Sequence, residues 1–193
     1  MIQMKYSVNF FLSLITVIVL LPSCANIIPP GGGPRDSLPP RLVMALPKDS
    51  ATNLSITTKN VLLTFDEYVT MQNIQENLVV SPTLKNTPSV DSKLRNITVR
   101  FRDTLDPNTT YTLDFGDAIK DVNEGNIAKN FSYVFSTGST IDHYTYRGKV
   151  LLAENGKTDS TLIVVLHRNL ADTAVAKERI RYYARITGKG DFI

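Results

Sequence analysis

Apolar and polar residues alternate with a period of two along several short segments after residue 40. The segments 95–102, 111–115 and 131–135 place an apolar side chain at every second position. Shorter apolar runs cover 60–65 and 78–80. Because successive side chains of a strand point to opposite faces of its sheet, these segments are predicted to be strands with one face in a core. Turn residues between them, about every ten residues, predict an all-β sandwich in which the apolar faces of two sheets form the core.

A turn of specific composition precedes the segment 111–115. Leu105, Pro107, Thr109 and Tyr111 are spaced two residues apart in the sequence LDPNTTY. In Greek-key sandwiches a tyrosine in this place sends its hydroxyl back to the upstream backbone and closes a corner between two sheets. Pro107 restricts φ in such a turn, and the Thr109 hydroxyl can bond locally. An ordinary Pro-Asn turn followed by a core tyrosine is the alternative.

The first forty residues have a different pattern. After Lys5, the run 8–21 is apolar except at three positions. It is too short to cross a bilayer comfortably, since a membrane helix takes roughly 20 residues, and it suits the apolar part of a secretory signal peptide over residues 1–23. Residues 24–40 contain five prolines and three consecutive glycines and are predicted to be a flexible tether. A phosphate-binding loop is not indicated, because no Lys-Ser or Lys-Thr pair follows the glycines.

The chain's one cysteine stands where these two segments meet. Leu21-Pro22-Ser23-Cys24 resembles the lipobox of bacterial lipoproteins, with a leucine three places before the cysteine and a small residue next to it. The resemblance implies cleavage before Cys24 and acyl chains on its sulfur and amino group, and hence the membrane as a partner. Pro22 is a less usual residue in the motif. An ordinary signal peptide, or a short membrane helix, with an incidental cysteine is the alternative.

Several ordered motifs resemble the bacterial Ig-like domain of the SbsA type, also called Big_5. The matching segments are 47–54, 61–69 as the first core strand, the turn 105–111, 120–126 and the closing strand 133–138. The resemblance implies that residues 41–138 fold as an Ig-like Greek-key β-sandwich. The resemblance implies a spacer or binding module of a cell-surface or envelope protein, with no shared catalytic residues. Tyr68 replaces the proline that is usual in the first core strand.

The C-terminal third carries further strand signals. Strands are predicted over 146–152, 161–166 and 181–186, the second of them buried, and a hairpin-type turn over 154–157. Their order resembles the start of a transthyretin-like, carboxypeptidase-regulatory-type sandwich, placed at 144–193. Because such a domain takes roughly 100 residues to close its core, we expect an incomplete second β-sandwich. Truncation of a longer chain is the favoured explanation, and packing on a partner is the alternative.

Composition and charge argue against some function classes. The formal charge is +3 with 20% charged residues, and Lys and Arg are scattered among Asp and Glu, so no nucleic-acid partner is expected. His143 and His167 lie on different segments, and neither an HExxH nor a GxSxG motif occurs. Asp66 and Glu67 are adjacent and would point to opposite faces of a strand. No enzyme activity and no cofactor are therefore expected.

The loop 121–126 collects oxygen-bearing side chains. Asp121, Asn123 and Asn126 are weak candidate ligands for a calcium ion, since hard cations prefer oxygen. Their spacing does not match the D-x-D-x-D-G loop, and Asn-Glu-Gly-Asn is also a sequence that a reversing chain needs. A turn is the favoured interpretation, and no metal is assigned.

Five Asp-Ser or Asp-Thr dipeptides precede Ala, Leu or Thr, which resembles the acceptor motif of general O-glycosylation in some Gram-negative envelopes. The acceptors would be Ser37, Ser50, Thr104, Ser160 and Thr173. Glycans on surface turns are sterically reasonable. Because the same dipeptides are common in loops, both interpretations stay open.

Together these features predict a lipoprotein of the Gram-negative outer membrane that acts as a structural or binding module. One alternative is an accessory region of a larger envelope enzyme. Another is a carbohydrate- or peptide-binding receptor with exposed aromatic residues on one sheet face. The side of the membrane, and any protein or glycan partner in the envelope, stay open.

Overall fold

The computed structural model describes residues 33–159 and 161–193. It divides into a unit of residues 1–35 and a unit of residues 36–193, and all elements below belong to the second unit. The predicted signal peptide, the predicted lipid site Cys24 and the acceptor Ser160 lie outside the described residues. No helix in the described ranges is long and apolar enough to cross a membrane.

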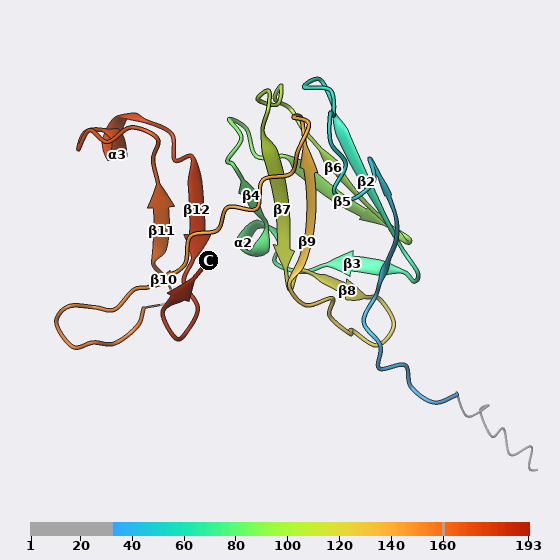
Figure 1. Cartoon of the computed structure of the whole chain (residues 1–193). Coiled ribbons are helices and arrows are strands. Elements are labelled where there is room, and N and C mark those ends of the chain that lie inside the picture. The colour runs from blue at the N-terminus through green and yellow to red at the C-terminus, as the bar shows by residue number, and fades with distance from the viewer. Residues whose placement is uncertain (1–32, 160) are drawn as a thin grey trace, which may run out of the picture. The chain divides into compact units, whose positions relative to one another are not determined.

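The first sheet of the sandwich has four antiparallel strands (Figure 1). In sheet order they are β1 (Leu42–Leu46), β2 (Asn60–Phe65), β6 (Asn96–Arg100) and β5 (Ser89–Lys93). β2 pairs with β6 so that Val61 lies opposite Val99 and Leu63 lies opposite Ile97. All four of these side chains are buried, because the period-two pattern puts them on the same face.

The second sheet of the sandwich has three strands, and a separate ribbon has two strands. The three strands are β4 (Val79–Ser81), β7 (Thr110–Gly116) and β9 (Phe131–Ser136), in the order β4-β7-β9. The ribbon pairs β3 (Val69–Met71) with β8 (Ile119–Asp121), and the short helix α2 (Ile74–Asn77) connects β3 to β4. The all-β prediction is confirmed by this architecture.

One hydrophobic core joins the two sheets. It is built from side chains that alternate along β2, β6, β7 and β9, of which the largest fully buried ones include Phe65, Ile97, Tyr111, Leu113, Phe115, Tyr133 and Phe135. Phe135 lies among aromatic neighbours, with its ring centroid 5.4 Å from that of Tyr111 and 5.9 Å from that of Tyr133. The Tyr133 hydroxyl donates to the Pro47 carbonyl at 2.9 Å, which satisfies its polar end inside the core.

Two sequence predictions need correction in this part of the chain. The segment 61–69 is not one strand, since β2 ends at Phe65 and a bend over Asp66 and Glu67 separates it from β3. Leu78 is the C-cap of α2, so the strand predicted over 78–80 begins one residue later. The charged pair Asp66 and Glu67 interrupts the first segment where the chain bends, whereas Leu78 packs on the core although it caps the helix.

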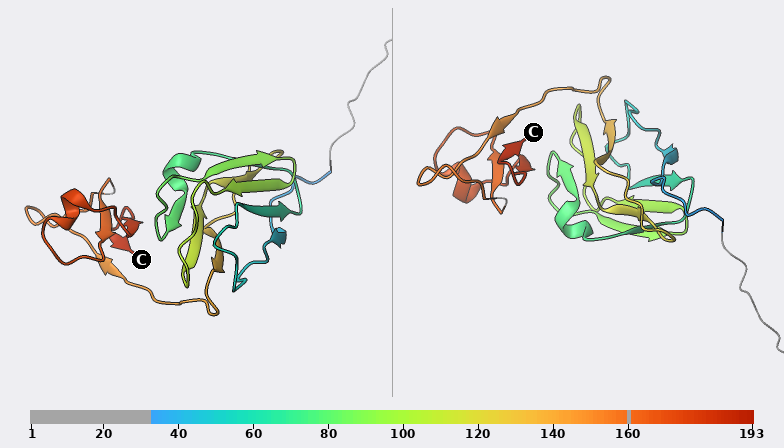
Figure 2. Two further views of the ribbon diagram at one scale, coloured as in Figure 1. Left: turned by 90° about the horizontal axis from the view of Figure 1, so that it is seen from above. Right: turned by 90° about the horizontal axis from the view of Figure 1, so that it is seen from below.

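The C-terminal segment contains short ribbons. Its elements are β10 (Gly148–Lys149), β11 (Ile163–Leu166), α3 (Ala174–Lys177), β12 (Tyr182–Arg185) and β13 (Asp191–Phe192). β10 pairs with β13, and β11 pairs with β12, both antiparallel. In Figure 2 these C-terminal elements are the ones coloured orange to red. The turn predicted over 154–157 is present and is closed by a 2.8 Å hydrogen bond from the Leu152 N–H to the Lys157 carbonyl.

Two strands of this segment differ from expectation. The strand predicted over 146–152 forms over two residues only. The strand predicted over 161–166 forms from Ile163, but it is not buried, since Ile163 is 49% exposed and Leu166 is 55% exposed. An apolar run shows that a strand is able to be buried but not what would cover it. Among the described residues, β11 pairs only with β12, in a two-stranded sheet.

Candidate functional site

The corner turn joins Leu105 to Tyr111 through local hydrogen bonds. The Tyr111 hydroxyl accepts a hydrogen bond from the Asp106 backbone N–H at 2.9 Å. The Thr109 hydroxyl donates to the Pro107 carbonyl at 2.8 Å, and the Leu105 side chain is buried. This is the geometry that defines a tyrosine corner. Burial of the ring raises the pKa of Tyr111, because desolvation disfavours the phenolate.

We expect Tyr111→Phe to lower the free energy of unfolding by about 1 kcal/mol, since it leaves the Asp106 N–H without its acceptor. Urea denaturation followed by circular dichroism measures the loss. Tyr68→Phe is the matched control, because it removes a hydroxyl from a tyrosine that is exposed. Equal stability of the wild type and the Tyr111→Phe variant would contradict a role of this hydroxyl in the corner.

The corner also contacts the C-terminal segment. The Asp106 carboxylate binds the Arg181 guanidinium at 2.5 Å. Two residues after the end of β4, the Thr83 N–H donates to the Arg181 carbonyl at 2.9 Å, and the Thr83 hydroxyl donates to the Ile180 carbonyl. Neither contact was expected from the sequence, because each joins residues that lie far apart along the chain.

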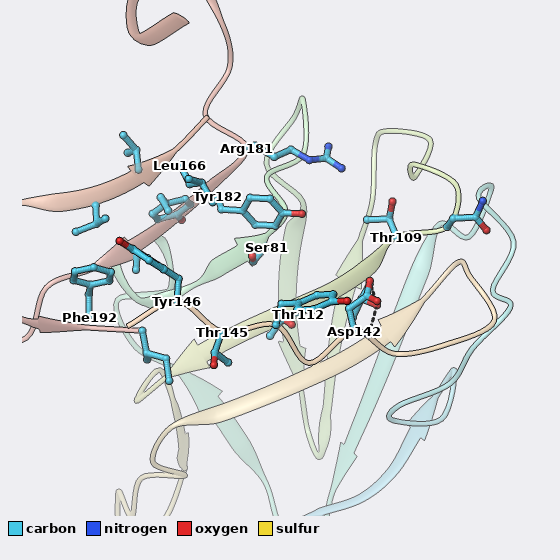
Figure 3. Close-up of a pocket in the computed structure, with 18 residues that line it drawn as sticks. Ser81, Thr109, Thr112, Asp142, Thr145, Tyr146, Leu166, Arg181, Tyr182 and Phe192 are labelled. Atoms are coloured by element: carbon cyan, nitrogen blue, oxygen red, sulfur yellow. Dashed lines mark hydrogen bonds between the residues drawn. The ribbon is translucent and has the colours of Figure 1, made fainter. Parts of the chain in front are cut away.

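A cleft of about 600 Å³ lies next to these contacts (Figure 3). Its walls come from the corner, from β4 and β7, from the segment 142–146 and from the C-terminal strands. Aromatic lining residues include Tyr144, Tyr146, Tyr182 and Phe192, and polar ones include Ser81, Asn108, Thr110, Thr112 and Asp142. Tyr144 is 95% exposed and Tyr146 is 73% exposed. No motif in the sequence predicted this site, although the alternation Tyr144-Thr145-Tyr146 in a polar segment is a usable signal.

The proposed calcium ligands are part of a turn that Asp121 closes. The buried Asp121 carboxylate accepts backbone N–H groups from Glu124 at 2.6 Å, from Gly125 at 2.9 Å and from Asn126 at 2.6 Å. Gly125 has a φ of 82°, which favours glycine in this reversal. In the described ranges, no three His, Cys, Asp or Glu side chains gather as a possible metal site. The oxygens of Asp121 thus serve the backbone of its own loop.

Asp66 and Glu67 lie at the bend after β2. The Asp66 carboxylate accepts the Arg41 N–H at 2.8 Å and pairs with the Arg41 Nε at 3.0 Å. The backbone hydrogen bond from Arg41 is the main reason why the pKa of Asp66 is lowered. Burial, together with the nearby carboxylates of Asp121 and Asp66, raises the pKa of Glu67. Asp66 is thus engaged in an ion pair that ties β1 to the end of β2.

The possible O-glycosylation sites that the structure describes are on the surface. Ser37, Ser50, Thr104 and Thr173 are exposed and lie outside strands and helices. The preceding Asp side chains often hold the local backbone. Asp36 accepts the Leu38 N–H at 2.9 Å, Asp49 accepts the Val134 N–H at 3.0 Å and Asp103 accepts the Asn86 N–H at 2.5 Å. The dipeptides therefore have structural roles whether or not their hydroxyls carry glycans.

The two histidines are placed separately. His143 is exposed in the segment that follows the sandwich. His167 follows β11, and both of its ring nitrogens are buried without a hydrogen-bond partner among the described residues. Neither residue lines the cleft described above.

Comparison with known proteins places the sandwich in a family. The bacterial Ig-like domain family Big_5 matches residues 36–137, more than half of the chain. The crystal structure of the S-layer protein rSbsC(31-844) matches with a TM-score of 0.35 and 20% sequence identity, over 81% of this chain and 19% of that chain. This chain thus spans less than a fifth of the S-layer protein's length. No curated protein matches the sequence. The chain therefore belongs to the family of bacterial Ig-like domains called Big_5.

Proposed function

We propose that the chain is a lipoprotein of the Gram-negative outer membrane, anchored through Cys24, whose Ig-like domain is a non-catalytic structural or binding module. The observation that carries the proposal is the order of the motifs. The lipobox-like Leu21-Pro22-Ser23-Cys24 is followed by a Pro/Gly-rich stretch, and the family match begins at residue 36. Residues 33–39 are exposed and form no helix or strand, as a spacer between an anchor and a folded domain requires.

The physics of lipid anchoring supports this arrangement. Each buried CH₂ contributes ~0.8 kcal/mol, so that one acyl chain binds marginally and two or more anchor stably. Proline-rich segments extend by about 3.1 Å per residue, which holds a folded domain away from the lipid surface. Big_5 domains are non-catalytic modules, which favours a structural or binding role over the alternative of an enzyme accessory region.

Cell fractionation tests the anchor. We expect Cys24→Ala to move the protein from the membrane fraction to the soluble fraction, because no acyl chain can be attached. Asn26→Ala is the matched control, since it changes a neighbouring residue and leaves the thiol intact. Globomycin, which blocks lipoprotein signal peptidase, should make the unprocessed precursor accumulate. A Cys24→Ala protein that still sediments with membranes and resists washing would refute the proposal.

Protease treatment of intact cells then determines the side of the membrane. Digestion of the Ig-like domain would place it on the cell surface, and protection would place it in the periplasm. Disruption of the outer membrane is the control, because it should expose the domain in either case.

A further inference from the structure

We propose that the cleft lined by Tyr146, Tyr182, Phe192, Ser81 and Thr112 binds a neutral oligosaccharide. Its volume of about 600 Å³ falls within the range of roughly 300–1,000 Å³ that small-molecule sites occupy. The inference does not depend on lipidation of Cys24, because it rests on residues 81–193 alone.

One wall of the cleft is a row of hydroxyls. Ser81 on β4 lies directly opposite Thr112 on β7, and Thr110 lies on the same face of β7, two residues away. Because Tyr111 and Leu113 point into the core, these threonines point out of the sheet toward the cleft. The Asp142 N–H donates to the Thr110 hydroxyl at 2.9 Å, and this hydroxyl donates to the Asp142 carboxylate at 3.3 Å. These two bonds hold the carboxylate at the same wall, where its remaining lone pairs can accept further hydrogen bonds. Hydroxyl and carboxylate groups of this kind pair with the hydroxyls of a sugar.

The other wall is aromatic. The ring centroids of Tyr146 and Phe192 are 5.9 Å apart. Figure 3 shows the two rings side by side. Tyr182 is 39% exposed on β12 and lines the same cleft. A pyranose ring has apolar C–H faces and a rim of hydroxyls, so it matches a site with one aromatic and one hydroxyl wall. Exposed aromatic side chains provide a large contact area and lose little conformational entropy when a ligand binds.

The charges of the cleft favour a neutral ligand. Arg181 is the one cation among its described lining residues, and its guanidinium is paired with Asp106 at 2.5 Å and lies 5.9 Å from the centroid of the Tyr182 ring. No cation of the described lining is thus left for a phosphate or a polyanion. An extended peptide is less suited, because the chain next to the edge of β4 is already bonded to the C-terminal segment between Thr83 and Arg181.

The binding test uses the full chain, purified from membranes in a zwitterionic detergent so that no sugar-based detergent competes. Maltohexaose, cellohexaose and chitohexaose are the probes. Isothermal titration calorimetry measures affinity, and tyrosine fluorescence reports on the site, since the chain has eight Tyr and no Trp. We expect at least one probe to bind with a Kd of about 1 mM or tighter. No binding of any probe at about 10 mM would overturn the proposal.

Variants locate the binding. Tyr146→Ala should weaken binding about tenfold, whereas Tyr146→Phe, which keeps the ring, should bind nearly as well as the wild type. Asp142→Asn, a change at an exposed side chain, is a second test and should also weaken binding. Tyr68→Ala is the control, because Tyr68 is an exposed tyrosine outside the cleft. Equal loss in the Tyr68→Ala variant, or none in Tyr146→Ala and Asp142→Asn, would overturn the proposal.

The proposed lipid anchor and the proposed sugar site can be refuted independently of each other. The Cys24→Ala protein should bind the same probe with unchanged affinity, because Cys24 is not part of the cleft. Loss of sugar binding in that variant would contradict a site built from the cleft residues. Retention of the protein in membranes would refute the anchor and leave the binding result as it stands.

Discussion

Replacing Phe135 by alanine is expected to lower the free energy of unfolding of the Ig-like domain by about 3–5 kcal/mol. Phe135 is fully buried at the centre of the core, and its ring centroid lies 5.4 Å from that of Tyr111 and 5.9 Å from that of Phe101. Its removal leaves a cavity beneath rings that come from separate segments of the chain and cannot all move inward. Since domains are stable by about 5–15 kcal/mol, such a loss would unfold a measurable fraction of the molecules.

Urea denaturation followed by circular dichroism measures this loss. Ser132→Ala on the same strand is the control, because Ser132 is exposed, and we expect it to change stability by less than about 0.5 kcal/mol. A Phe135→Ala protein as stable as the control would show that the aromatic residues do not form the core described above.

The strands of the core could be predicted because their sequence pattern reports burial directly. Along β7, Tyr111, Leu113 and Phe115 are all buried, and the residues between them are half-buried. Period-two alternation arises only when one face of a strand is covered and the other is not. The Tyr111 corner could also be predicted from the sequence, because its hydrogen bond with the Asp106 N–H joins residues only five positions apart.

The edge strand β5 was missed for a physical reason. Its sequence Ser89–Lys93 is mostly polar, and none of its residues is buried. Pairing with β6 makes it a strand, through a two-residue turn at Leu94 and Arg95 in which Leu94 has a φ of 56°. Turns of this kind usually contain Asn or Gly, so the hairpin signal was absent from the sequence.

The cleft could not be predicted because no short segment contains it. Ser81, Thr112, Tyr146 and Tyr182 come from four parts of the chain, and folding alone brings them together. A sequence does not distinguish an exposed tyrosine from a core tyrosine, especially where tyrosines also occupy the apolar positions of neighbouring alternating strands. The error over the strand at 161–166 has a related cause, since an apolar run does not indicate which element covers it.

Replacing Asp121 by asparagine is expected to lower the free energy of unfolding at neutral pH by about 1–3 kcal/mol. The Oδ1 atom accepts the N–H groups of Glu124 and Gly125, and an asparagine oxygen can still do so. The Oδ2 atom accepts the Asn126 N–H at 2.6 Å, and an asparagine NH₂ in its place would put two donors against each other. Removing one partner of a buried hydrogen bond leaves the other with its full cost of desolvation.

The loss of unfolding free energy caused by Asp121→Asn should depend on pH. Burial alone would raise the pKa of Asp121, but the backbone hydrogen bonds from Gly125, Glu124 and Asn126 outweigh it and hold this pKa below its ordinary value. A carboxylate with a lowered pKa in the folded state stabilises the protein above its unfolded pKa of about 3.9, and this contribution disappears as the pH falls through the folded-state value. The stability difference between wild type and Asp121→Asn should therefore shrink from pH 7 toward about pH 3 in urea titrations.

Asp172→Asn, at an exposed site, controls for the general effect of losing a carboxylate and should show a small difference at both pH values. A wild-type advantage over Asp121→Asn that stays constant with pH would contradict an ionised Asp121 as the group that closes the loop.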